Sequence, residues 1–246
     1  MTVRATPELQ ARLLDLQAID TRTQQIAHAK RTLPQIAALA ALTGESEALR
    51  RRVGTERGVL DDIRSELRRI ESDVAVVETR IARDTQRLQS SASAKDSQGL
   101  EHELASLTRR RSDLEDVQLD LMDRVETQEK VFADLEAQQA ELTARADQLA
   151  VERQAAAATL DAEAEQLVVS RDALVRSLPE DLVALYERQR SRYGIGAALL
   201  RRGVSGGSNV ALNASDLATI RATAPDEIVI DPESGCILVR TEESGL

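Results

Sequence analysis

Hydrophobic residues recur along most of the chain at alternating steps of three and four positions, the spacing of an α-helical coiled coil. One seam runs from Val53 to Leu88, and nine of its eleven positions are Val, Leu or Ile. A second runs from Leu100 to Ser177 in a single register, with fifteen apolar residues in twenty-three positions. A shorter seam near the start follows similar spacing: Leu9, Leu13, Leu16, Ile19, Ile26, Leu33 and Ile36.

The breaks between these seams predict one antiparallel hairpin with arms of nearly equal length, residues 7–90 and 97–178. The small, polar run at 90–99 suits a turn near 91–99, and Asp96 or Ser97 is expected to cap the next helix. Pro34 and Gly44 predict a kink near 34–44 in the first arm. Polar seam residues are expected to fix the register or, alternatively, to form a partner groove: Arg111, Gln118, Gln128, Gln139, Arg153 and Glu163.

A second, small module is predicted after residue 178, where glycine becomes frequent and proline reappears. Pro179 and two acids begin a short helix, residues 193–200 form a strand, and Asn213 caps a helix that runs to about Arg221. Residues 227–230 and 237–240 are predicted as two strands around a turn. The predicted fold is mainly α: a long antiparallel coiled-coil hairpin over residues 1–178, then a small α+β module over 179–246.

The apolar residues of this module are expected to pack together and against the helix at 180–190, with Tyr186 and Tyr193 between them. The core candidates are Ile195, Leu199, Leu200, Val210, Leu212, Leu217, Ile220, Ile228, Ile230, Ile237, Leu238 and Val239.

The amino-acid composition restricts the possible functions of the chain more than its possible folds. Aromatic residues are 1% of the 246, which fits a narrow seam of Leu, Ile, Val and Ala. The single cysteine, Cys236, excludes an internal disulfide and a multi-cysteine zinc site, and His28 and His102 have no ligand partners nearby in sequence. No phosphate-binding glycine loop or catalytic constellation is present. We therefore expect no enzyme activity, no catalytic residues and no cofactor.

Hydropathy and charge argue against two further classes, membrane proteins and proteins that coat nucleic acid. No run approaches 18 apolar residues and the N-terminal stretch lacks a signal-peptide core, so we expect a soluble cytoplasmic protein without membrane contact. The net charge of −10 disfavours extensive coating of nucleic acid.

Several stretches resemble a bacterial family that combines a coiled-coil hairpin with a C4-type zinc ribbon. The most specific are Pro225-Asp-Glu-Ile-Val229 and Gly235-Cys-Ile-Leu-Val-Arg240, supported by the run from Leu212 to Arg221. The weaker hairpin matches are Leu13–Asp20, Leu33-Pro34, Lys95, Leu100–Leu104 and Leu178-Pro179. The resemblance covers essentially the whole chain and implies adaptor or chaperone-like roles, associated in some members with transcription, secretion or flagellar components.

In that family two CxxC pairs hold a structural zinc. The resemblance places these ligands at Ser205 and Ser208 and at Asp231 and Ser234, so the spacing is kept but every cysteine is replaced. Serine hydroxyls bind zinc poorly, and we expect a ribbon-like module without metal. Cys236 is expected to point away from these positions as a small buried strand residue, with a reactive or intermolecular thiol as the alternative.

Basic clusters carry an alternative function. Five arginines lie within residues 188–202 with no acid between them: Arg188, Arg190, Arg192, Arg201 and Arg202. They are either ordinary surface charge or an RNA contact, with Tyr193 available for stacking.

The favoured prediction is a structural or interaction protein whose charged helical faces, hairpin tip and C-terminal module contact protein partners. RNA binding at residues 188–202 is the alternative. Metal delivery is disfavoured because the cysteines are missing. Monomer and homodimer both remain open.

Overall fold

The computed structural model describes residues 3–246 and contains two compact units. The first comprises the described residues up to Pro34 together with Glu152–Leu246, and the second comprises Gln35–Val151. This division differs from the boundary placed after residue 178, because the first helix of the chain packs on the C-terminal sheet.

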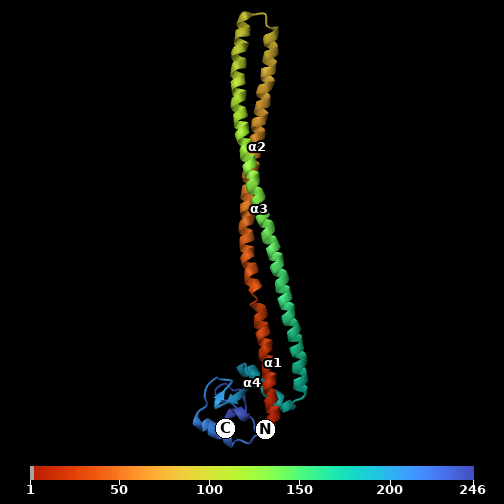
Figure 1. Cartoon of the computed structure of the whole chain (residues 1–246), viewed down its shortest axis with the longest axis vertical. Helices are drawn as coiled ribbons and strands as arrows, with labels where there is room; N and C mark the ends of the chain where they lie inside the picture. The colour runs from red at the N-terminus through yellow and green to blue at the C-terminus, as the bar shows by residue number, and fades with distance from the viewer. Residues whose placement is uncertain (1–2) are drawn as a thin grey trace. The chain divides into compact units, whose positions relative to one another are not determined.

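The second unit is a helical hairpin, which confirms the predicted fold class. Its arms belong to helices α2 (Pro34–Ser90) and α3 (Ala94–Arg176), which run side by side to the turn between them (Figure 1). Ile63, Ile70 and Leu121 are buried at the seam, as the spacing of three and four predicts. Four partly buried residues pack against them: Leu67, Val74, Leu114 and Val125.

Both interruptions of the hairpin are shorter than predicted. The turn occupies residues 91–93, and Ser93 Oγ, rather than Asp96 or Ser97, accepts the capping hydrogen bond, here from the backbone N–H of Asp96 (3.4 Å). Near the predicted kink, helix α1 (Pro7–Arg31) ends and α2 begins at Pro34. Gly44 lies inside α2, so the interruption is confined to the residues just before the proline, which cannot continue a preceding helix.

The first unit contains the small sheet and the helices around it. Its C-terminal elements are α4 (Glu180–Tyr193), β1 (Ala197–Arg201), β2 (Val204–Ser205), α5 (Ala214–Ala222), β3 (Val229–Ile230), β4 (Ile237–Val239) and the 3₁₀ helix η1 (Glu242–Ser244). The strand order is β2-β1-β4-β3, with β1 parallel to β4 and the outer pairs antiparallel. The predicted strands and capped helix are present, with Asn213 Oδ1 accepting from Asp216 N–H (2.8 Å).

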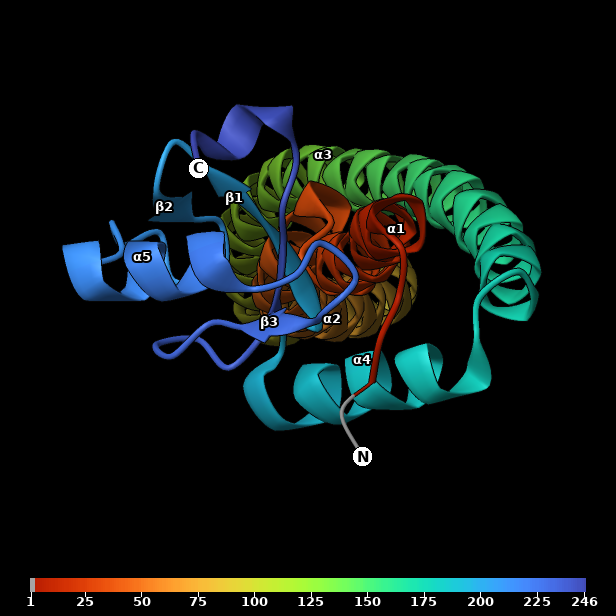
Figure 2. The same cartoon turned by 90° about the horizontal axis from the view of Figure 1, so that it is seen from below.

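Both faces of this sheet are buried, because alternate residues of a strand point to opposite sides. Figure 2 shows α1, α4 and α5 arranged around it. One core contains Ala5, Leu13, Leu16, Leu178, Leu182, Tyr186, Ala197, Ile237 and Val239. The other contains Leu200, Leu212, Ile220 and Leu238.

The first core contains α1 residues that sequence reasoning assigned to the hairpin alone. Conversely, the core candidates Val210 and Ile230 are exposed, and Tyr193 is 46% exposed rather than enclosed.

Candidate functional site

A partly buried polar cluster joins α1, α3 and α4 within the first unit. We call it the neck cluster; its members are Gln17, Asp20, Arg171, Tyr186, Glu187 and Arg190. Asp20 is 4% exposed and occupies the helical position that follows Leu13 and Leu16 at steps of three and four. A carboxylate at such a position is costly unless it is paired and hydrogen-bonded.

Asp20 has three partners. Arg171 donates through Nε to Oδ1 (2.7 Å), and the Tyr186 hydroxyl donates to Oδ2 (2.8 Å). Arg190 Nε lies 3.3 Å from Oδ2. Glu187 pairs with both arginines, so three helices are joined by alternating charges.

These contacts shift the ionisation of their members. Hydrogen bonding to Asp20 raises the pKa of Arg171, and burial together with the Asp20 contact raises the pKa of Tyr186. Burial alone would raise the pKa of Glu187, but the hydrogen bonds from Arg171 and Arg190 hold it below its ordinary value. The carboxylate of Glu187 therefore stays charged and both arginines remain engaged at neutral pH, an arrangement suited to holding helices together rather than to proton transfer.

Gln17 extends this cluster to the sheet. Its Oε1 accepts the backbone N–H of Gly196 (2.7 Å), just before β1, and lies 3.2 Å from the Tyr186 hydroxyl. Gly196 is needed there because a Cβ would fall 2.4 Å from the Tyr186 ring. One glutamine thus connects the first helix of the chain to a strand about 180 residues later.

The positions to which the resemblance assigns zinc ligands lie in two turns that face each other. The knuckle cluster consists of Ser205, Asp231, Ser234 and Cys236. Ser205 Oγ donates to Asp231 Oδ2 (2.6 Å), and Ser234 Oγ donates to the same oxygen. Ser208 stands outside the cluster: its N–H bonds to Ser205 Oγ (3.4 Å), and its own Oγ faces the N–H of Val210.

Burial alone would raise the pKa of Asp231, which is 1% exposed. The hydrogen bonds from Ser205, Ser234 and the backbone N–H of Glu233 outweigh that effect and hold the pKa of Asp231 below its ordinary value. The cluster therefore contains a buried, fully hydrogen-bonded carboxylate.

The expectation that Cys236 points away from these positions is wrong. Its Sγ lies 3.1 Å from Ser234 Oγ, because the tight turn closed by Gly235 N–H to Asp231 carbonyl folds the two side chains together. A Cβ on Gly207 would lie 2.5 Å from both Sγ and Ser234 Oγ. The predicted burial is confirmed: Cys236 is fully buried beside β4, and burial raises the pKa of its thiol.

Arg240 organises the loop between α5 and β3. Its guanidinium donates to five backbone carbonyls, those of Ile220, Thr223, Ala224, Pro225 and Glu227, at 2.7–3.3 Å. Burial lowers the pKa of Arg240, an effect that the nearby acids Glu227 and Asp226 oppose. Sequence reasoning used this arginine only as part of a family motif.

The structure does not gather the five arginines of 188–202 into one free basic surface. Arg190 belongs to the neck cluster, and Arg201 Nε pairs with Glu243 (3.0 Å). Arg202 has a left-handed backbone (φ 48°) in the turn between β1 and β2. Arg188 and Arg192 are exposed, and Arg192 lies over the Tyr193 ring at 5.2 Å.

One polar seam residue of the hairpin unit, Gln128, bonds across the seam. Gln128 Nε2 donates to Glu56 Oε2 (2.6 Å), which supports a register role for Gln128. Asp84 is buried at the seam near the turn, with Arg80, Arg83 and Arg87 at 3.5–3.9 Å.

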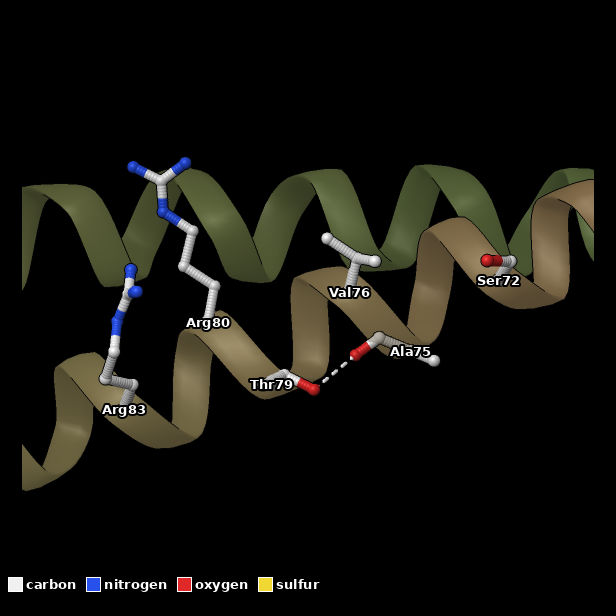
Figure 3. A pocket seen from close by; sticks show the side chains of 6 residues that line it. All are labelled: Ser72, Ala75, Val76, Thr79, Arg80 and Arg83. Atoms are coloured by element: carbon white, nitrogen blue, oxygen red, sulfur yellow. Dashed lines mark hydrogen bonds between the residues drawn. The ribbon is translucent and has the colours of Figure 1, made fainter.

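The outward faces of the hairpin unit carry the remaining candidate surfaces. On α3, four exposed aspartates recur at steps of three and four: Asp113, Asp116, Asp120 and Asp123. Within residues 3–246, no cationic side chain lies within 4 Å of their carboxylates. On α2, a shallow hollow of about 410 Å³ is lined by Ser72, Ala75, Val76, Thr79, Arg80 and Arg83 (Figure 3).

The described part of the chain offers neither a metal centre nor a membrane span. No group of three or more His, Cys, Asp or Glu side chains within residues 3–246 is arranged to hold a metal ion. Among the same residues, no helix combines the length and hydropathy needed to cross a bilayer.

The match to a known family covers the hairpin unit and the helical part of the first unit. The model of the CT398-like coiled coil hairpin domain matches residues 16–194. The chain belongs to the CT398-like coiled-coil hairpin family. It is 37% identical over 237 residues to the uncharacterized protein Rv2229c of Mycobacterium tuberculosis, covering 95% of this chain and 96% of that one.

Solved structures show the same architecture. A Mycobacterium smegmatis protein superposes with a TM-score of 0.85 at 31% identity, over 97% of this chain and all of that one. CT398 from Chlamydia trachomatis superposes with a TM-score of 0.64 at 17% identity, over 95% and 98% of the two chains. The second likeness is one of fold alone.

Sequence reasoning missed the neck cluster entirely. Arg171 lies about 150 residues after Gln17 and Asp20, and the three residues share no sequence motif. No local pattern therefore connects them. The available signal was Asp20 itself, a charged residue continuing the apolar spacing of Leu13 and Leu16.

Proposed function

We propose that this chain is a non-enzymatic structural or interaction protein of the cytoplasm, with an adaptor or chaperone-like role, that contacts protein partners through its hairpin faces and its C-terminal module. The observation that carries the proposal is the row of unpaired aspartates on α3. Like charges three and four residues apart destabilise a helix by about 0.2–0.5 kcal/mol per pair. Within residues 3–246 no cation forms an ion pair with these four carboxylates, and a basic partner surface would supply one.

Apolar side chains flank this row. Leu119 is 60% exposed, and Val117 and Met122 are also exposed. A row of acids bordered by apolar groups suits a partner helix that presents arginine or lysine beside hydrophobic residues.

The absence of enzyme activity is proposed because the side chains with shifted pKa values serve to hold helices together. Arg171, Tyr186 and Glu187 have shifted pKa values, but each is engaged in contacts between helices. Two hollows of the hairpin unit, one beside Val76 and one beside Asp123, are open surface bordered by helix side chains.

We propose further that the C-terminal module is a ribbon whose knuckles are joined without zinc. The donors at the four positions are three hydroxyls and one carboxylate, and Asp231 Oδ2 already accepts two hydrogen bonds. Thiolates are the ligands that bind structural zinc tightly, and hydroxyls are poor substitutes. Metal analysis of untagged protein by mass spectrometry tests this: a stoichiometric zinc content would overturn it.

The partner proposal is tested by photo-crosslinking in cells with the crosslinking residue placed at Leu119. Placement at Val169, an exposed apolar residue farther along α3, is the matched control. We expect adducts specific to the Leu119 position that disappear when the four aspartates are changed to asparagine. Adducts that persist in the asparagine variant, or that form equally at Val169, would argue against the acidic row as the contact surface.

RNA binding at residues 188–202 remains the alternative proposal. It now rests on Arg188, Arg192, Arg202 and Tyr193, because Arg190 and Arg201 have carboxylate partners. The two proposals separate in salt-dependent binding of single-stranded RNA. Binding that is lost on changing Arg188 and Arg192 to alanine would favour RNA, and no binding at low salt would remove it.

A further inference from the structure

Residues 241–245, which we call the strap, fold back onto the turn between β1 and β2. They contain the 3₁₀ helix η1, which lies beside these two strands (Figure 2). Two backbone N–H groups of the turn donate to strap carbonyls: Arg202 to Glu243 (2.9 Å) and Gly203 to Ser244 (3.2 Å). The strap therefore supplies the acceptors for both donors of the turn.

Ser244 fixes the strap to β1. Its side chain is buried, and its Oγ donates to the carbonyl of Leu200 (2.8 Å) while accepting the backbone N–H of Thr241 (2.9 Å). On the surface, Arg201 Nε pairs with Glu243 (3.0 Å). Removing the Ser244 hydroxyl leaves a buried carbonyl and a backbone N–H without this partner, which is more costly than losing an exposed hydrogen bond.

The turn and the strand β2 depend on such outside support. Arg202 (φ 48°) and Gly203 (φ 76°) are both left-handed, a conformation that glycine adopts readily and arginine does not. β2 has two residues, each paired with one residue of β1. A strand pair this short is marginally stable by itself. The hydrogen bonds from the strap are therefore a substantial part of what holds β2 in place.

β2 leads directly into a loop that covers Cys236. We call this loop, residues 205–209, the lid. Gly206 N–H donates to the carbonyl of Leu199 (2.9 Å), which closes the lid against β1. The backbone of Gly207 lies against the thiol, so closely that a Cβ there would fall 2.5 Å from Sγ. Cys236 is fully buried beneath it.

We propose that the strap keeps the lid closed over Cys236, so that release of the strap exposes the thiol while the rest of the sheet stays folded. The sheet can remain folded because β1 pairs directly with β4 at three positions that do not involve β2. The lid is also joined to the second knuckle, through Ser205 Oγ and Asp231 Oδ2 (2.6 Å). Strap release therefore raises the population of an open lid, a local opening of the kind that precedes global unfolding.

Alkylation of the full chain by iodoacetamide, followed by intact-protein mass spectrometry, tests the proposal. Cys236 is the single cysteine, so the mass increase reports on one thiol. We expect Ser244→Ala to label about tenfold faster or more than the wild type, because the strap loses its buried anchor. Ser215→Ala, the same change at an exposed position on α5, is the matched control and should stay within about twofold.

A second variant lifts the lid without touching the strap. Gly207→Ala places a methyl group where the thiol and Ser234 already lie, so it should also speed labelling. Adding Ser244→Ala to Gly207→Ala should then change the rate little, because the lid is already open. Amide hydrogen exchange of α4 and β4, measured in each variant, should stay within about twofold of the wild type and so separates lid opening from loss of the fold.

Three outcomes overturn the proposal. The first is a Ser244→Ala chain that labels at the wild-type rate. The second is labelling and β4 amide exchange that accelerate by the same factor, which would mean that the whole sheet opens. The third is a double variant whose labelling rate rises by the product of the two single effects, which would mean that the strap and the lid act independently.

Discussion

Replacing Asp20 with asparagine tests whether the neck cluster holds the first unit together. The change keeps the size of the side chain and removes its charge. Arg171 and Arg190 then lose their shared carboxylate, and the new amide group faces a guanidinium.

The expected cost follows from the contacts. Asp20 accepts two short charged hydrogen bonds, at 2.7 Å from Arg171 and 2.8 Å from Tyr186, and lies 3.3 Å from Arg190. Hydrogen bonds to charged groups contribute about 1.5–3 kcal/mol each, and removing one member of a buried pair costs about 3–5 kcal/mol. Glu187 still pairs with both arginines, so we expect a loss of about 3 kcal/mol in the free energy of opening.

Amide hydrogen exchange is the suitable assay because it reports on α4 and β1 separately from the hairpin unit. A loss of about 3 kcal/mol corresponds to roughly 100-fold faster exchange of the protected amides there. Asp15→Asn, at an exposed position on the same helix, is the control and should change exchange little. Tyr186→Phe should cost about 1–1.5 kcal/mol alone and combine with Asp20→Asn non-additively, because the two changes remove one shared hydrogen bond.

Two results would refute this reasoning. One is an Asp20→Asn chain whose α4 and β1 amides exchange as in the wild type. The other is strict additivity with Tyr186→Phe, which would mean that the two side chains contribute independently.

Three further changes probe the small module. Asp231→Asn should lower the free energy of unfolding at neutral pH and make it depend less on acid. The depressed pKa of Asp231 stabilises the fold at pH values above the ordinary value near 4, and this contribution is lost as the pH falls. A pH titration followed by circular dichroism measures both effects. Arg240→Met should lower the free energy of unfolding by about 3 kcal/mol by leaving carbonyls unpaired, whereas Arg221→Met, at an exposed site, should not, as thermal melts would show. Gly196→Ala should destabilise by about 2 kcal/mol because its Cβ overlaps a tyrosine ring, whereas Gly54→Ala, with open space around it, should stabilise by about 0.5–1 kcal/mol in denaturant titrations.

Each of these has a contrary outcome. An unchanged acid profile in Asp231→Asn would mean that the carboxylate is not the group responsible. Equal melting of the Arg240 and Arg221 variants would remove the loop-anchoring role. A stable Gly196→Ala chain would show that the tyrosine ring has room to move.

The hairpin could be predicted because the pattern that forms each helix involves residues close together in the sequence. Apolar residues at steps of three and four indicate one buried stripe along a helix. Pro34 predicts a break in that helix whatever residues surround it. The turn was overestimated because Ala94–Gly99 contains residues that suit either a turn or a first helical turn. Only the Ser93 cap decides between them.

The site was less predictable because its members meet only in three dimensions. The two x2-spaced turns were found from the resemblance, but the direction of Cys236 depends on the backbone of the turn closed at Gly235. Asp20 and Arg171 are about 150 residues apart, so no sequence window contains both. The α1 contribution to the sheet core was hidden because Leu13 and Leu16 fit a coiled-coil seam equally well.

That shared core sets an order of events during synthesis. Leu16 leaves the ribosome early, whereas Ile237, which belongs to the same core, is made more than 200 residues later. At 5–20 residues per second, the apolar face of α1 waits roughly 10–45 s for the strand that covers it. The hairpin unit does not depend on the last residues, so it is free to fold while the chain is still being made. The packing of the N-terminal helix onto the sheet is then a late step. Until that step the leucines of α1 are exposed to any chaperone that binds nascent chains.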